Sequence, residues 1–246
     1  MDQTSRQALN RNDAAMPLSP VWWLHLPVAV FLLLVLLFQF STVLFAGWFD
    51  GERGALEIAQ FVILLTSTVV GVRLVFHPVT RRTPGLLLWS SLATLGVAYT
   101  AGEEISWAQH LVGWGTPHWW ADLNDQGETN LHNVSSWLDQ KPRALLEVGI
   151  VIGGIVLPLL LRAVPRLQQV RAATIVPPLA LLPLALLAEL ARLGERARDV
   201  FGSQPEIVYR PSEVQELFFF WFALIYLIVL YRRVADEETQ PLIACT

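Results

Sequence analysis

A long uncharged apolar stretch near the N-terminus constrains this chain more than any other feature. Between Ala14 and Phe49 the sequence contains no Asp, Glu, Lys or Arg. This length is well beyond the roughly 7–15 apolar residues of a signal-peptide core. A single helical crossing of a bilayer needs only about 20 apolar residues. The stretch is therefore predicted to be an uncleaved first membrane span.

Five further apolar runs follow, and each can cross a bilayer once its charged ends are included. Only 15% of the residues are charged, against about 25% in a typical soluble domain. Six such runs fill the chain, so we expect an all-α fold, a polytopic transmembrane helix bundle of about six spans. The predicted spans are residues 23–47, 56–76, 85–105, 143–163, 173–191 and 213–232.

Two cytoplasmic tails, residues 1–20 and 234–246, are predicted to flank a transmembrane domain at residues 21–233. A partly helical interfacial loop, 106–142, is expected between spans three and four. The fifth run contains three prolines, at 177, 178 and 183, so its helix is expected to be kinked. The only cysteine, Cys245, allows neither an intrachain disulfide nor a thiolate-rich metal site.

Basic residues set the expected orientation. With six spans, ten of the 17 Lys and Arg residues fall on the side of the two termini and seven on the other side. Cytoplasmic loops carry the excess of basic residues, so both termini are predicted to be cytoplasmic. The formal net charge of -4 and the lack of a strongly basic segment argue against nucleic acid as a partner.

Acidic residues are distributed far more unevenly. Sixteen of the 21 fall on the side opposite the termini or at the span ends that face it. Every span after the first brings at least one glutamate to this level: Glu57, Glu103, Glu104, Glu147, Glu189, Glu213 and Glu216. Each alone could be a solvated span end, but ionisable groups at membrane spans indicate a functional site when so many converge.

The segment after span three is unusually rich in tryptophan. Half of the ten tryptophans lie between Trp107 and Trp137. Tryptophan favours the headgroup level, so this loop is expected to lie in the outer interface, as an ordinary aromatic belt or as the cover of a site. The predicted substrate or interface residues are Trp107, Gln109, Trp114, Asn130 and Asn133.

Two adjacent acids, Glu103 and Glu104, are the predicted catalytic residues. Crowding two like charges raises one pKa, which suits acid and base chemistry. If the third span continues as a helix, Glu103, Trp107 and His110 share one face at i, i+4 and i+7.

A metal site is predicted from a second pair in the same segment. Glu128 and His132 are four residues apart, so one helical turn could point both at one metal. With Glu103 they are the predicted ligands of a divalent metal, zinc or similar. An exposed i, i+4 pair on a surface helix is the simpler alternative.

Two distinctive strings frame this segment: GEEISWAQHLVGWGTP at residues 102–117 and NDQGETNLHN at residues 124–133. They resemble the GEEISWGQ-like and QGExNLHN-like motifs of an uncharacterised family of bacterial multi-pass membrane proteins. That family usually has a glycine and a basic residue where Ala108 and His110 stand, which disfavours His110 as a ligand. The resemblance implies a bacterial inner-membrane setting and a motif-centred site, without naming a reaction.

Three functions fit this pattern. The first is an integral inner-membrane enzyme, metal-dependent, acting on a lipid or lipid-linked substrate at the outer leaflet. The second is a transporter with an external acidic vestibule, which the lack of ionisable residues near the midplane of the spans disfavours. The third is a non-catalytic subunit of a larger complex, for which Gly149, Gly153 and Gly154 offer a close-packing face. Expected partners are membrane lipids, and a membrane protein or a second copy of the chain.

Overall fold

The computed structural model describes residues 16–40, 54–118, 136–164, 166–167, 174–202 and 207–243. All regular structure in this part of the chain is helical, which confirms the predicted all-α fold class. A sixth apolar helix, Leu179–Ala191, is shorter than the five that are long and apolar enough to cross a membrane. Those five are Val21–Phe40, Ala55–Phe76, Pro84–Glu104, Arg143–Ala163 and Pro211–Asp236.

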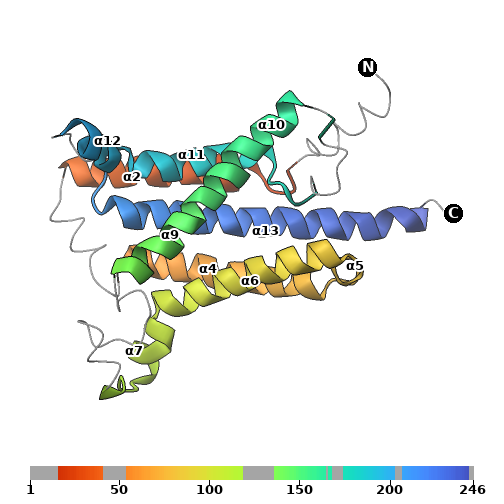
Figure 1. Cartoon of the computed structure of the whole chain (residues 1–246), viewed down its shortest axis with the longest axis horizontal. Helices are drawn as coiled ribbons and strands as arrows, with labels where there is room; N and C mark the ends of the chain where they lie inside the picture. Colours follow the sequence, from red (N-terminus) through yellow and green to blue (C-terminus); the bar gives the residue numbers. More distant parts are fainter. Residues whose placement is uncertain are drawn as a thin grey trace.

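Successive helices alternate in direction along one long axis (Figure 1). The first three crossings comprise η1 (Val21–His25) with α2 (Leu26–Phe40), α4 (Ala55–Phe76), the short turn helix α5 (Pro78–Arg82) and α6 (Pro84–Glu104). The later crossings comprise α9 (Ser136–Ile150) with η4 (Val151–Val156) and α10 (Leu157–Ala163), η7 (Leu179–Leu181) with α11 (Leu182–Ala191) and α12 (Leu193–Phe201), and α13 (Pro211–Ile243).

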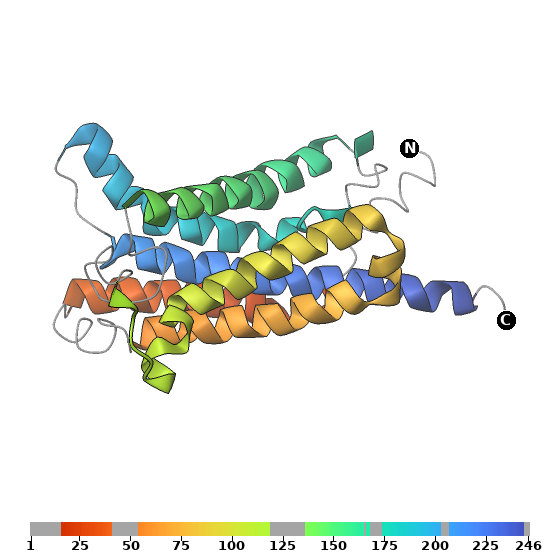
Figure 2. The ribbon, with the colours of Figure 1, turned by 60° about the horizontal axis from the view of Figure 1, so that its bottom comes forward.

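The last helix, α13, is the centre of the bundle. In its most apolar stretch 67% of the residues are buried, against 17 to 28% in the other four long spans. It runs parallel to α4, because Gln60 donates to the Glu213 carbonyl near one end and the His77 ring meets Tyr231 edge-on near the other. Figure 2 shows α13 between the α4 and α6 pair and the α9 and α11 pair.

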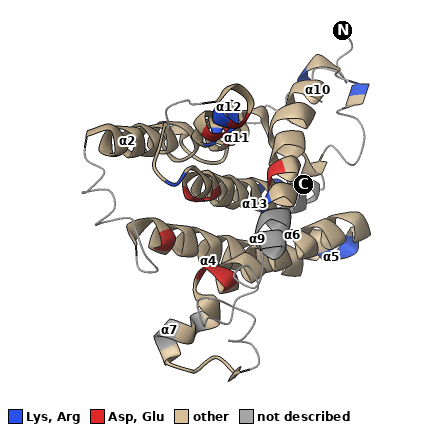
Figure 3. Cartoon of the chain, turned by 60° about the vertical axis from the view of Figure 1, so that its left-hand side comes forward, with Lys and Arg blue, Asp and Glu red and all other residues tan. Residues whose placement is uncertain are grey.

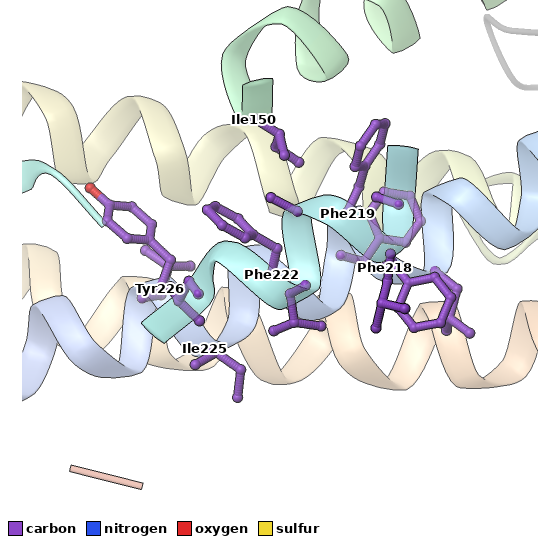
Figure 4. Close-up of a cluster of buried hydrophobic side chains, with 14 of the residues drawn as sticks. Ile150, Phe218, Phe219, Phe222, Ile225 and Tyr226 are labelled. Atoms are coloured by element: carbon purple, nitrogen blue, oxygen red, sulfur yellow. The ribbon is translucent and has the colours of Figure 1, made fainter. Parts of the chain in front are cut away.

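Aromatic side chains of α13 fill the core. Phe218 and Phe219 are fully buried, and Figure 4 shows them beside Phe222 and the facing Ile150 of α9. The Phe31 ring of α2 lies 5.8 Å from that of Phe218. Lipid tails are as apolar as these side chains, so close packing rather than exclusion from water holds the helices together.

The helical backbone of the fifth apolar segment is interrupted: Thr174 and Ile175 lie in a 3-10 turn, Val176 to Pro178 are not helical, and the next helix starts at Leu179. The kink expected within this segment thus takes the form of a break before a helix start. Pro177 and Pro178 have no backbone N–H, and Pro178 has extended dihedrals (φ -68°, ψ 153°). Proline at the first turn of a helix costs no hydrogen bond, and Pro183 stands at that position in α11.

Side chains of α13 take the carbonyls that the residues before this helix leave free. Arg233 Nη1 donates to the carbonyls of Thr174 and Val176, at 2.9 and 2.8 Å, and the Tyr226 hydroxyl donates to that of Ile175 at 2.6 Å. Non-helical backbone at membrane depth is tolerated only where the protein itself satisfies it. Arg233 and Tyr226 supply the hydrogen-bond donors that satisfy these carbonyls.

Gly71 of α4 marks the closest approach to α6. A Cβ at Gly71 would lie 2.5 Å from Thr94 Oγ1, whose hydroxyl donates to the Ser90 carbonyl.

We expect Gly71→Ala to destabilise the protein by about 1–3 kcal/mol through overpacking, measured as a lower melting temperature in detergent. Adding Thr94→Ala should restore most of the loss. Gly96→Ala is the control, since its Cβ would meet nothing within 4 Å. A Gly71→Ala protein that melts with the wild type would contradict the packing.

Candidate functional site

Carboxylates from several helices meet at one end of the bundle, which we call the acidic end. It lies at the left of Figure 1, where α4, α9 and α13 begin and α6 ends. Figure 3 shows acidic residues where α4 begins and α6 ends, and arginines on α5 at the opposite end. Arg81 and Arg82 of α5 lie there, as do Arg162 near the end of α10 and Arg232 in the last part of α13.

Glu104, the last residue of α6, lies among carboxylates of other helices. Glu57 of α4 and Glu213 and Glu216 of α13 are close enough to act on its charge, as is Arg143 of α9. Arg143 Nε also donates to Glu216 Oε1 at 2.6 Å. We call these five residues the Glu104 cluster. Four helices thus bring four carboxylates and one guanidinium to the end of the spans.

A buried amide extends the Glu104 cluster toward the core. Gln60, one turn after Glu57, is fully buried, and its Nε2 donates to the Glu213 carbonyl at 3.0 Å. Its Oε1 has no hydrogen-bond partner among the described residues. A buried acceptor left unpaired costs about 1–3 kcal/mol. Such a group beside carboxylates is typical of a polar site rather than of a packed core.

The chain turns sharply immediately after Glu104. Ser106 and Trp107 have φ angles of 46° and 53°, in the left-handed region that residues other than glycine rarely adopt. The third span therefore does not continue as a helix through His110: α6 ends at Glu104, one residue before the predicted end of the span, and α7 (Gln109–Val112) is a separate short helix. Strained non-glycine residues cost roughly 1–3 kcal/mol each and cluster at functional sites.

The turn folds Trp107 back onto the end of α6. Its Nε1 donates to Glu103 Oε1 at 2.7 Å. A Cβ on Gly102 would lie 2.8 Å from Trp107 Cζ3, so the ring rests on the glycine backbone. The Tyr99 and Trp107 rings meet edge to face at 5.9 Å, and Tyr99 lies near enough to the Glu103 carboxylate to feel its charge. Glu103 and Trp107 thus meet through a turn rather than along one helix face.

The other predicted site residues lie beyond this turn. Gln109 Nε2 donates to Thr116 Oγ1 at 2.8 Å, which closes the short loop after α7, and Trp114 is exposed in that loop. The remaining four predicted residues lie outside the described part of the chain: Glu128, Asn130, His132 and Asn133.

A second ionic group at the acidic end joins α9 to α11 and α12. Arg196 pairs with both Glu147 and Glu189, and Arg192 pairs with Glu195 at 2.7 Å and lies 3.7 Å from Glu147. Burial lowers the pKa of Arg196, but its bonds to Glu189 and Glu147 outweigh this and hold that pKa above its usual value. Two arginines thus bridge three glutamates, and every carboxylate of the group has a guanidinium partner, so we regard this group as a structural clamp.

The outer side of α12 is apolar. Leu193, Val200 and Phe201 are exposed, Phe201 by 76%, while Arg196 on the same helix reaches inward to Glu147 and Glu189. An apolar outer side at a span end is typical of an interfacial helix. We expect a fluorophore on Phe201→Cys, with Cys245→Ser, to be quenched by spin-labelled lipid more strongly than one on Asp199→Cys. Equal quenching at the two positions would contradict this placement.

In the described part of the chain, the acidic and histidine side chains do not gather as metal ligands would. No group of three or more His, Cys, Asp or Glu side chains there is placed to hold a metal ion. Of the three predicted ligands only Glu103 is described, and Trp107 donates to its carboxylate. A metal at this end would therefore need ligands from residues 119–135.

Comparisons of the chain with protein-family models, with curated proteins and with solved structures find no match. The chemistry of the acidic end is therefore the basis on which a function can be assigned.

Proposed function

We propose that this protein is an integral membrane enzyme of the bacterial inner membrane that acts on a lipid or lipid-linked substrate, with the Glu104 cluster as its active site. One observation carries the proposal: α4, α6 and α13 each bring carboxylates to the same end of the spans, where those of Glu57, Glu213 and Glu216 are near enough to Glu104 to act on its charge. Ionisable groups at membrane depth are costly, and they mark substrate or ion sites.

The position of the Glu104 cluster supports the substrate class. The cluster lies where the apolar parts of three spans end, which is the level of lipid headgroups. Trp107 and Trp114 are exposed close by in sequence, as expected for side chains at that level. A headgroup or a lipid-linked group could reach Glu104 there while its chains remain in the bilayer.

The orientation that we propose places the acidic end at the outer leaflet and both termini in the cytoplasm. The ion pairs at the acidic end support it, because glutamates there neutralise the charges of four arginines: Arg143, Arg192, Arg196 and Arg210. The opposite end carries the arginines of α5 and α10, as cytoplasmic surfaces do.

A C-terminal green fluorescent protein fusion should fluoresce, and a C-terminal alkaline phosphatase fusion should be inactive; the reverse result would overturn the orientation.

In the proposed mechanism Glu104 is a general base or acid, and Glu128 and His132 would hold a divalent metal. Glu57, Glu213 and Glu216 lie near enough to Glu104 to act on its charge, and a carboxyl group is an ordinary general acid or base. A metal at Glu128 and His132 would supply Lewis-acid activation of the substrate or of a water molecule.

Lipid analysis together with metal analysis tests this function. Cells that overproduce the wild type should show a changed lipid or lipid-linked pool, and Glu104→Gln should abolish the change. Asp236→Asn, an exposed acid in the last part of α13, is the control and should behave as wild type. Purified protein should carry a divalent metal that Glu128→Ala or His132→Ala removes.

Two results would count against the enzyme. An identical lipid composition with wild type and with Glu104→Gln, together with no bound metal, would exclude it. Stable co-purification with one fixed membrane protein, again without a lipid change, would instead favour a subunit of a larger complex.

A further inference from the structure

We infer that the two adjacent glutamates have different roles: Glu103 is a positioning residue that, with Tyr99 and Trp107, locks the turn after α6, and Glu104 is the group that reacts. This division rests on the proposed function and refines its site. It also adds Tyr99, a residue that the motif strings do not include.

The two carboxylates have different surroundings. Glu103 is only 6% exposed, its carboxylate accepts from the Trp107 indole N–H, and the Tyr99 ring packs against that of Trp107. Glu104, one residue later, interacts with the acids of α4 and α13 and with Arg143. The side chains of consecutive helical residues point about 100° apart. Glu103 and Glu104 can therefore reach different neighbours although they are adjacent in the sequence. Glu103 thus contacts a residue of its own segment, Trp107, whereas the neighbours of Glu104 come from other helices.

The turn after α6 is strained, so it requires stabilising contacts; we call those made by Tyr99, Glu103 and Trp107 the lock. Two consecutive left-handed residues, Ser106 and Trp107, cost roughly 1–3 kcal/mol each. A hydrogen bond to a charged group contributes about 1.5–3 kcal/mol, and Trp107 makes such a bond to Glu103. The contact between the Trp107 ring and Gly102 adds packing that any larger residue at 102 would prevent. These contacts offset the strain and fix the point at which α6 ends.

The end of α6 determines where Glu104 lies. Glu104 is the last helical residue, and Ile105, the C-cap, already has non-helical dihedrals (φ -112°, ψ 20°). If the turn relaxed, α6 could extend or fray by a residue, which would rotate Glu104 away from Glu57 and Glu216. The lock formed by Tyr99, Glu103 and Trp107 therefore sets the geometry of the proposed reactive group without touching the substrate.

Fluorine NMR of the full chain in nanodiscs, with 5-fluorotryptophan incorporated, tests the lock independently of activity. The Trp107 resonance is identified as the one missing in Trp107→Phe. We expect Glu103→Ala to shift this resonance, Tyr99→Phe to shift it less, and Glu104→Gln to leave it in place. In Glu103→Gln the amide oxygen can still accept from the indole, so the resonance should stay near its wild-type position.

Lipid conversion measured on the same samples separates the two roles. Glu103→Gln should retain most of the conversion, Glu103→Ala should lose most of it, and Glu104→Gln should abolish it. The inference is overturned if Glu103→Ala leaves the Trp107 resonance unchanged, or if Glu103→Gln abolishes conversion while the resonance stays in place. If the wild type converts no lipid, the proposed function fails, and the division of roles fails with it even where the resonances show the lock.

Discussion

Replacing Arg233 with alanine should lower the melting temperature of the purified protein far more than replacing the neighbouring Arg232 with alanine. Arg233 Nη1 donates to two carbonyls, those of Thr174 and Val176. Without it, both carbonyls remain in a region where lipid offers no donor. Each hydrogen bond to a charged group contributes about 1.5–3 kcal/mol, so we expect a loss of about 3 kcal/mol.

Arg232 provides a matched control, because it lies on the same helix and in the same sequence context but is exposed. Arg233→Lys should recover only part of the stability, since a single ammonium on a flexible stem cannot match the planar guanidinium. Tyr226→Phe should destabilise the same segment, because the hydroxyl donates to Ile175 and accepts from Trp89 Nε1. Equal melting temperatures for Arg232→Ala and Arg233→Ala would show that the carbonyls find other partners.

Hydropathy alone predicts the long helices of this fold closely. The second and third predicted spans, 56–76 and 85–105, correspond to α4 (Ala55–Phe76) and α6 (Pro84–Glu104). An apolar run of this length has few structures available to it in a bilayer, because every backbone group must be satisfied within the segment. Length and composition are therefore enough to place such helices.

The fifth segment shows where hydropathy stops being informative. Its apolar run does not reveal that the helix begins only after Pro178, because that depends on a donor supplied from elsewhere in the chain. Arg233 supplies it from 57 residues away in sequence. In the sequence Arg233 is one more arginine at a span end, and only the packing of α13 against this segment gives it a structural role.

The sequence predicts which end of the bundle the glutamates share but not the geometry of the candidate site. The common end follows from helix direction alone, and Glu57, Glu213 and Glu216 are near enough to Glu104 to act on its charge. The turn at Ser106 and Trp107 was not predictable, since neither residue is glycine and nothing local requires a left-handed backbone. The i, i+4 spacing of Tyr99 and Glu103 is the one signal in the sequence that could have identified Tyr99.

The three glycines of the fourth span are not equivalent in the structure. A Cβ at Gly154 would lie 2.8 Å from Phe222 Cε2 and 3.1 Å from the Ala185 Cβ, so this glycine lets η4 approach both α11 and α13. At Gly149 and Gly153 a Cβ would meet nothing within 4 Å. The close-packing face that the sequence suggests is thus divided. Gly154 makes an internal contact, whereas Gly149 and Gly153 form an open strip.

Gly154→Leu should therefore destabilise the protein by about 3 kcal/mol or prevent its folding, because a core this close has no room for a large side chain. Gly153→Leu, one residue earlier, should change stability by less than about 1 kcal/mol, and any change should favour the helix. The thermal stability of both variants in detergent, followed by size-exclusion chromatography, provides the comparison. The stability of Gly154→Ala is expected to lie between those of the wild type and Gly154→Leu. If Gly153→Leu folds normally but abolishes function in the membrane, the open strip contacts another protein. That result would favour a subunit of a complex over an enzyme that works alone.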